Sequence, residues 1–279
     1  MSEIWDVMKW PLATCLLLPP LLVYLGLHVV QRGVIFVDLA LAQVATLGAC
    51  LALFIGHLTG NAIDLHDPIT FWISLAVTLI AAALFSVSRG SVKRQVPQEA
   101  IIGIAFVVAA AGGIALLSQV EGGSEEVQNL LVGEILTVTR EEVFRRVALF
   151  GALAIFYAAF HKKFELISFD PQKAEASGLR IRMWDFLFYA VFGLVVVSFV
   201  RVAGVLLTFS YLIVPAVCGV LLARTLMMRL LMGWGISVGA SLVGLWASYQ
   251  LDLPTGAAIV CALGFVLGMV SIAIVARRR

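Results

Sequence analysis

Few polar side chains interrupt the long apolar segments of this chain, and some of them could bind a metal ion. Asp38, Gln43 and Thr46 lie within the apolar segment 34–56, and His28 lies near the end of the segment before it. In a helix, Gln43 and Thr46 share one face, whereas Asp38 is turned from Gln43 by about 140°. Carboxylate and imidazole groups bind divalent metals well, and an amide oxygen binds zinc weakly. Because a polar group inside an apolar segment is costly unless it faces a cavity or a partner, these residues predict a polar path through an apolar region.

The same residues also have a purely structural explanation. His28 and Asp38 could pair with each other or with Arg32, which lies between them in the sequence. Such pairing would neutralise polar groups near the end of an apolar segment and would need no ligand. Both readings stay open on the sequence alone.

A second group of possible ligands occurs in the segment H-L-T-G-N-A-I-D-L-H-D-P, which separates two apolar segments. Its members are His57, Asp64, His66 and Asp67. Histidine and carboxylate groups suit metal capture. Loop residues at this spacing are more often simply solvated, and an exposed charged loop is equally suited to docking a partner protein. We keep all three interpretations.

The amino-acid composition indicates the environment in which the chain folds. Hydrophobic residues make up 62% of the 279-residue chain, charged residues 13%, and the mean hydropathy is +1.04. A soluble domain has roughly 45–50% apolar and 25% charged residues. We therefore expect an all-α, polytopic membrane protein that forms one domain, residues 1–279, with about eight or nine transmembrane helices. The apolar segments are 10–30, 34–56, 69–87, 99–117, 143–160, 184–200, 203–223, 230–249 and 256–276.

Several function classes are excluded. The formal net charge of +2 is too small, and the basic residues too scattered, for nucleic-acid binding. No G-x-x-x-x-G-K-[ST], H-E-x-x-H or G-x-S-x-G motif is present, so we expect no ATP binding by a P-loop and no enzyme activity in this chain. Cys15, Cys50, Cys218 and Cys261 lie singly in apolar segments and are expected to be packing residues.

Two segments depart from regular membrane spans. Pro19 and Pro20 should break the first helix, because proline removes a backbone donor. Residues 118–142 are too polar to cross a membrane and predict a surface or re-entrant helix. Basic residues then give the orientation: with the N-terminus outside, 14 of the 19 Lys and Arg residues lie in inner loops, so the C-terminus is expected in the cytoplasm.

The cytoplasmic segment at about 161–183 contains the signals of one short helix. Asp170 is its predicted N-cap, Pro171 its first residue and Gly178 its stop. A capped helix held between two membrane spans is suited to passing a mechanical push into the membrane.

Two motifs in this half of the chain carry a resemblance to a known family. The first is F-D-P-x-x-A-x-x-x-G, and the second is G-V-x-L-x-x-x-x-L-I-x-P-A. Together with weaker similarity over nearly the whole chain, they resemble the membrane permeases of the ABC importers for zinc, manganese and ferrous iron. The matching residues are Phe169, Asp170, Pro171, Ala174 and Gly178 in the first motif, and Gly204, Val205, Leu207, Leu212, Ile213, Pro215 and Ala216 in the second.

The resemblance implies an importer-type ABC permease in a bacterial inner membrane, embedded in lipid. It implies a second permease copy, either identical or a paralogue, cytoplasmic ATPase subunits that bind the ATP, and an extracytoplasmic metal-binding protein. The short helix at Asp170–Gly178 becomes the coupling helix that the ATPase receives. Tyr211 and Pro215 are expected on the broken helix of an outer hairpin that lines the path, and the cargo is zinc or manganese ahead of iron.

One departure from the family bears on the cargo. Leu39 and Gln43 stand where the family has an aspartate and a histidine one turn apart. Asp38 and His28 could supply the missing charge and imidazole. Two alternatives remain: the permease could import a chelated metal or another small ligand, or the chain could be a secondary transporter driven by a gradient, although neither internal repeats nor a proton-relay chain is visible.

Overall fold

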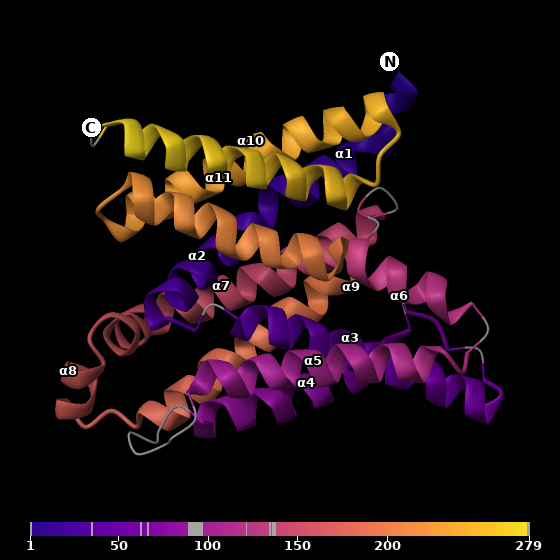
Figure 1. The fold of residues 1–279 in the computed structure, drawn as a ribbon, viewed down its shortest axis with the longest axis horizontal. Helices are drawn as coiled ribbons and strands as arrows, with labels where there is room; N and C mark the ends of the chain where they lie inside the picture. The colour runs from indigo at the N-terminus through magenta and orange to yellow at the C-terminus, as the bar shows by residue number, and fades with distance from the viewer. Residues whose placement is uncertain are drawn as a thin grey trace. The chain divides into compact units, whose positions relative to one another are not determined.

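The protein is described by a computed structural model of residues 2–34, 36–61, 63–65, 67–88, 97–120, 122–133, 135 and 138–277 (Figure 1). No strand occurs in these residues. The sequence's prediction of an all-helical protein is confirmed. The helices are α1 (Ser2–Leu17), α2 (Pro19–Arg32), α3 (Val37–Thr59), α4 (Pro68–Ser88), α5 (Gln98–Leu117), α6 (Gly123–Val132), α7 (Arg140–Phe169), α8 (Pro171–Ala176), α9 (Ile181–Leu222), α10 (Leu226–Leu251) and α11 (Thr255–Arg277).

Eight of the described helical segments are long and apolar enough to cross a membrane. The longest is α9, whose 42 residues cover two of the predicted spans. At about 1.5 Å per residue, such a helix is roughly twice as long as a bilayer core is thick. Gly204, with φ 71° and ψ 170°, is the non-helical residue inside it. The sixth and seventh predicted spans are therefore joined through a single break.

The two irregular segments behave as their sequences predict. The first span is divided into α1 and α2 at Leu18, directly before Pro19, and the Leu18 N–H donates to the Thr14 carbonyl at 3.2 Å. Residues 123–132 form α6, whose ten residues are too short to cross. The fifth span is longer than predicted, because α7 continues through the charged residues 161–169. Phe164 and Ile167 give this extension a buried face.

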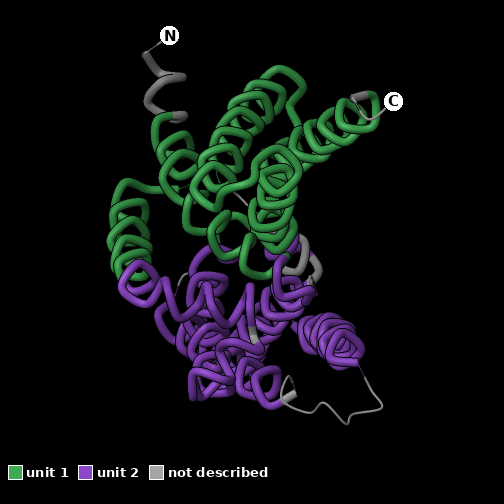
Figure 2. Tube along the Cα trace, turned by 90° about the vertical axis from the view of Figure 1, so that its left-hand side faces the viewer, with its two compact units in different colours: residues 1–30, 132–155, 202–279 green, residues 31–131, 156–201 purple. Residues whose placement is uncertain are grey.

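The described residues divide into two compact units, each assembled from separate stretches of chain (Figure 2). Unit 1 contains residues 1–30, 132–155 and 202–279, and unit 2 contains residues 31–131 and 156–201. Helices α2, α7 and α9 pass from one unit to the other.

Unit 2 is built around α3, which packs against both α4 and α5. Small residues allow the helices to approach closely, as is usual where lipid gives no hydrophobic drive for association. A Cβ added at Gly48 would lie 2.5 Å from the Ser74 Cα of α4, and one added at Gly113 of α5 would lie 3.3 Å from the Cys50 Sγ of α3.

Contacts within unit 2 also group its connecting segments into two sets. The Arg201 guanidinium donates to the carbonyls of Leu65 and Asp67, which joins the α3–α4 connection to the residues before Gly204. In the other set, the Ser86 hydroxyl at the end of α4 donates at 2.9 Å to the Arg182 carbonyl at the start of α9. These groups match the outer and inner loops expected from the charge count.

In unit 1, backbone segments meet closely at glycines. Gly133, which follows α6, has φ 72°, and a Cβ there would lie 2.1 Å from the Ala203 carbonyl carbon. A Cβ at Gly256, in the first turn of α11, would lie 2.3 Å from the Val132 carbonyl oxygen. The residues beside the break in α9 are thus packed against the backbone that follows α6.

We predict that Gly133→Ala destabilises the protein by about 2 kcal/mol or more, because it combines a positive φ with a backbone clash. The matched control is Gly235→Ala, on α10, where an added Cβ meets no atom within 4 Å. That change should leave stability unchanged or raise it by up to about 1 kcal/mol. The measurement is the thermal midpoint of the purified protein in detergent, and equal midpoints for both variants would contradict the packing described.

Candidate functional site

The short helix α8 forms where the sequence predicts it. Asp170 is the N-cap, and its Oδ1 accepts a hydrogen bond from the Lys173 N–H at 3.1 Å. Pro171 is the first helical residue, and Gly178, with φ 73°, follows the last turn. The Leu179 N–H then donates at 3.3 Å to the Ala174 carbonyl, which closes the C-terminal end. The prediction of both caps is confirmed.

α8 presents a polar surface on a short, well-defined element. Ala174 is fully buried, and Phe169 at its start is partly buried. Asp170 and the described side chains on either side of Ala174 are exposed; these are Gln172, Lys173, Glu175 and Ala176. One side of α8 is therefore anchored to the protein while its remaining surface is available to a partner.

A buried ion pair that the sequence did not predict joins the end of α2 to the beginning of α9. Arg32, the last residue of α2, donates from one terminal nitrogen to Asp185 Oδ1 at 2.8 Å, and both side chains are almost completely buried. Its Nε donates to the Ser168 Oγ at 2.9 Å. Breaking a buried pair by removing one partner costs about 3–5 kcal/mol. The available signal was Asp185, an acidic residue inside the apolar segment 184–200.

Asp38 is buried in the first turn of α3, with 2% of its surface exposed. Its Oδ1 accepts from the N–H of Leu39 at 2.8 Å, and its Oδ2 has no hydrogen-bond partner among the described residues. A buried carboxylate without a partner is costly, so such groups commonly mark functional sites in membrane proteins. Arg32, one of the partners considered for it, instead pairs with Asp185.

Gln43 and Thr46 also lie on the buried part of α3. The Thr46 hydroxyl donates to the Ala42 carbonyl at 3.1 Å, so it is satisfied within its own helix. The Gln43 side chain is buried, with 7% of its surface exposed. α3 therefore carries two buried oxygen-bearing side chains, Asp38 and Gln43.

His28 lies in α2 and is fully buried, with its ring packed edge-on against Tyr24 at 4.6 Å between centroids. It belongs to unit 1, whereas Asp38 belongs to unit 2. A shared role for the two residues stays a prediction.

Tyr211 and Pro215 are both buried in the second half of α9. The Tyr211 hydroxyl is hydrogen-bonded to the Ser241 hydroxyl of α10, and the Cys15 side chain of α1 lies within hydrogen-bonding reach of both. A Cβ at Gly233 would lie 2.9 Å from the Pro215 carbonyl oxygen. These residues connect α9 to α1 and α10, and their predicted place along a path stays a prediction.

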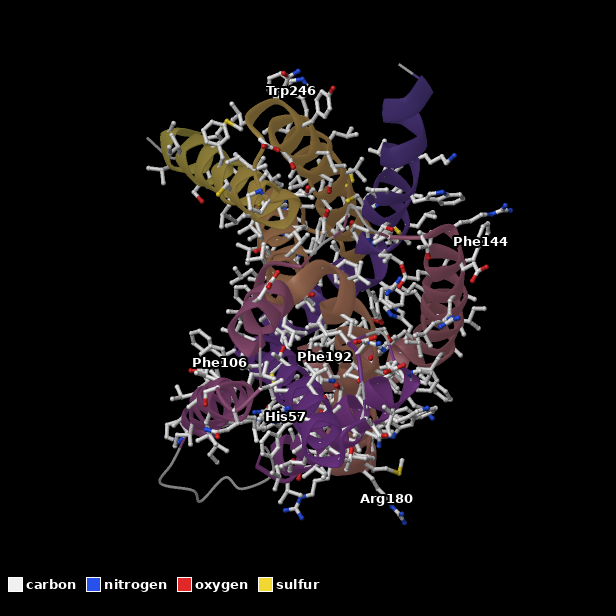
Figure 3. The ribbon with its side chains drawn as sticks, turned by 90° about the vertical axis from the view of Figure 1, so that its right-hand side faces the viewer. His57, Phe106, Phe144, Arg180, Phe192 and Trp246 are labelled. Atoms are coloured by element: carbon white, nitrogen blue, oxygen red, sulfur yellow. The ribbon has the colours of Figure 1, made fainter. Side chains whose placement is uncertain are left out.

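The candidate outer group is partly engaged in its own turn. Asp67 Oδ2 accepts from the Asp64 N–H at 2.8 Å, and the Asp64 carbonyl accepts from the Thr70 hydroxyl at 2.8 Å. His57 is exposed near the end of α3 (Figure 3). His66 lies outside the described residues. Within the described ranges, no three His, Cys, Asp or Glu side chains are grouped so that they could hold a metal ion.

Comparison with known proteins shows what this arrangement is similar to. Residues 5–274 match the ABC 3 transport family. The chain is 31% identical over 203 residues to the manganese transport system membrane protein MntC of Listeria innocua, covering 73% of this chain and 72% of that protein. It is 25% identical over 252 residues to the chelated iron transport system membrane protein YfeD of Yersinia pestis, covering 86% and 84%.

Among solved structures, the chain resembles PsaBC from Streptococcus pneumoniae in complex with Fab. The TM-score is 0.78 at 22% identity, and the match covers 96% of this chain and 94% of the other. This likeness extends over nearly every helix and concerns the fold.

We predict that Asp170→Ala weakens α8 by about 1 kcal/mol, because it removes the N-cap that satisfies the Lys173 N–H. Hydrogen exchange at the Lys173 amide should then quicken roughly fivefold. Asp170→Asn is the control, since asparagine caps helices equally well. Equal exchange rates in Asp170→Ala and wild type would show that the cap does not hold α8.

Proposed function

The chain belongs to the ABC 3 transport family, and from this premise we propose that it imports a divalent transition metal ion, with manganese as the first choice. It is a multi-pass permease subunit, and ATP hydrolysis lies in a separate subunit. The observation that carries the proposal is α8, a capped polar helix between two membrane spans at the position of the family's F-D-P-x-x-A-x-x-x-G motif.

The push from the ATPase would enter the permease at α8. Phe169, Asp170, Pro171, Ala174 and Gly178 define this element, through the N-cap, the buried anchor and the stop. Closure of the ATPase subunits on ATP would displace α8, and the spans that flank it would switch the path from outward to inward.

The chemistry of α3 supports manganese over zinc. Zinc prefers nitrogen and sulfur ligands, whereas manganese is well served by carboxylate and carbonyl oxygen. Asp38 offers an unpartnered carboxylate oxygen and Gln43 an amide oxygen. Both are buried side chains of α3, and replacement of the family's histidine by Gln43 moves the ligand set toward oxygen. MntC, a manganese transporter, supports the same choice.

A chelated cargo is the second candidate. It is favoured by Leu39, which is no ligand at all, and by the similarity to YfeD, a chelated iron transporter. Zinc is a further alternative that His28 would suit, since an imidazole could supply a nitrogen ligand.

The proposed assembly contains two permease copies in a bacterial inner membrane, with cytoplasmic ATPase subunits and an extracytoplasmic binding protein. The N-terminus lies outside and the C-terminus inside. The contacts of Arg201 with the α3–α4 connection, and of Ser86 with the start of α9, support the grouping of these loops on common sides. The choice of the cytoplasmic side rests on the distribution of Lys and Arg residues. The exposed connection with His57 and Asp64 would face the binding protein.

We predict that Asp170→Lys and Gly178→Trp abolish ATP-driven uptake of Mn²⁺ while the complex still assembles. The assay uses vesicles that contain the permease and its ATPase subunits, with ATP in the lumen. The control is Glu125→Lys, the same charge reversal at an exposed residue of α6. Uptake that persists without ATP and follows an imposed ion gradient would instead favour a secondary transporter.

We further predict that Asp38→Asn lowers Mn²⁺ uptake at least tenfold without affecting assembly or ATPase binding, because it removes the charge that replaces the water shed by the ion. Gln43→His should be tolerated and should raise Zn²⁺ uptake relative to Mn²⁺ by adding a nitrogen ligand. Normal uptake of both ions by Asp38→Asn would exclude this acid from the path and favour the chelated cargo.

A further inference from the structure

Arg32 joins three helices, because it belongs to α2 and its buried side chain bonds to residues of α7 and α9. It is the last residue of α2, and Gly33, with φ 69°, turns the chain toward α3. Its guanidinium bonds Ser168 in the last turn of α7 and Asp185 in the first turns of α9. Arg32, Ser168 and Asp185 all belong to unit 2.

The two partners of Arg32 stand on either side of α8. Ser168 lies two residues before the N-cap Asp170, and Asp185 lies seven residues after Gly178. The Arg32 guanidinium therefore bonds the chain at Ser168, just before α8, and again at Asp185, just after α9 begins. A displacement of α8 cannot separate the end of α7 from the beginning of α9 without breaking one of these two hydrogen bonds.

Aromatic rings make this connection stiff. The Arg32 guanidinium lies 3.9 Å from the centroid of Phe188, one turn beyond Asp185 on α9. The ring centroid of Phe188 lies 5.9 Å from that of Phe164 on α7, and the Tyr157 hydroxyl donates to the Phe188 carbonyl at 3.3 Å. The rings exclude water from the ion pair, which strengthens it, and they pack α7 against α9.

Along the chain, Arg32 is followed by the α2–α3 turn and then by the beginning of α3. Asp38 lies six residues after Arg32, in the first turn of α3. α3 is also the central helix of unit 2, since α4 and α5 both pack on it. A movement of Arg32 would consequently reach a buried carboxylate that has a free oxygen.

We propose that Arg32 is the positioning residue that transmits the displacement of α8 to the α2–α3 turn and so to the beginning of α3. This rests on the proposed function, in which an ATPase displaces α8. Arg32 does not touch the cargo in this mechanism. It holds the end of α2, the end of α7 and the beginning of α9 together, so that the three move as one body.

The test compares Arg32→Gln, Asp185→Asn and the double variant in vesicles with the ATPase subunits. Glutamine keeps a hydrogen-bonding amide, and the double variant removes both charges, so that neither is left unpaired in the interior. Arg180→Gln is the control: it also removes an arginine charge, from the connection between α8 and α9, and the Arg180 side chain is exposed and projects away from the helices (Figure 3). Thermal midpoints and copurification of the ATPase identify variants that fold and assemble.

Two readouts are needed. The first is Mn²⁺ taken up per ATP hydrolysed, which should fall at least tenfold in each single variant, while the rate of ATP hydrolysis changes less than threefold. The double variant should be no worse than either single variant, because all three cut the same connection. Arg180→Gln should match wild type. Equal losses of uptake and hydrolysis, or additive losses in the double variant, would overturn the proposal.

The second readout requires no cargo. Addition of a non-hydrolysable ATP analogue to the wild-type complex should change hydrogen exchange both in residues 170–179 and in residues 36–41. In Arg32→Gln the change at 170–179 should persist and the change at 36–41 should be lost. If wild type transports no Mn²⁺ but shows this pattern, the cargo assignment fails and the role of Arg32 stands. If residues 36–41 still respond in Arg32→Gln, the role of Arg32 fails whatever the cargo is.

Discussion

The core of a bilayer offers no hydrogen-bond partner to a peptide group, and this constraint decides most of the structure. Every apolar segment becomes a helix because a helix satisfies its own backbone. At the break before Pro19 the Leu18 N–H still reaches the Thr14 carbonyl at 3.2 Å, so the helical pattern continues up to the proline. The first span can therefore divide without leaving the Leu18 N–H unsatisfied.

The same constraint sorts the polar side chains by how they are satisfied. Thr46, Thr78 and Ser198 each donate to the carbonyl four residues before them, which satisfies the hydroxyl within its own helix. Arg32 and Asp185 form an ion pair. Asp38 belongs to neither group, because its Oδ1 accepts from the Leu39 N–H and no ion pair to its carboxylate occurs within the described residues. This lack of a cationic partner is the reason for proposing Asp38 as the residue that meets the cargo.

Close packing of helices provides the stiffness that a transporter needs. Since lipid is as apolar as leucine, contact between spans depends on shape, and small residues bring backbones together. Gly48 of α3 meets Ser74 of α4, and Gly244 of α10 meets Ile259 of α11. Aromatic rings have the same role at the end of α7, where Phe164 packs against Trp184 and Phe188 of α9, and Phe188 lies against the Arg32 guanidinium. Such cores do not deform gradually, so the proposed push at α8 would be carried to distant residues.

Features that depend on neighbouring residues could be predicted from the sequence alone. The N-cap of α8 at Asp170, its stop at Gly178, the division of the first span at Pro19 and the apolar spans all follow from local backbone chemistry and from the length needed to cross a bilayer. Contacts between distant groups, in contrast, could be seen only in the folded protein. Arg32 and Asp185 are 153 residues apart, and Tyr211 and Ser241 come from different helices. An arginine at a helix end has the same local pattern whether it faces water or a buried aspartate, so the sequence offered Arg32 as a partner for His28 or Asp38 and did not indicate Asp185. Likewise, the pattern around Asp38 could not show that Arg32 is engaged elsewhere, because the partner of a buried charge is fixed by helix packing and not by spacing along the chain.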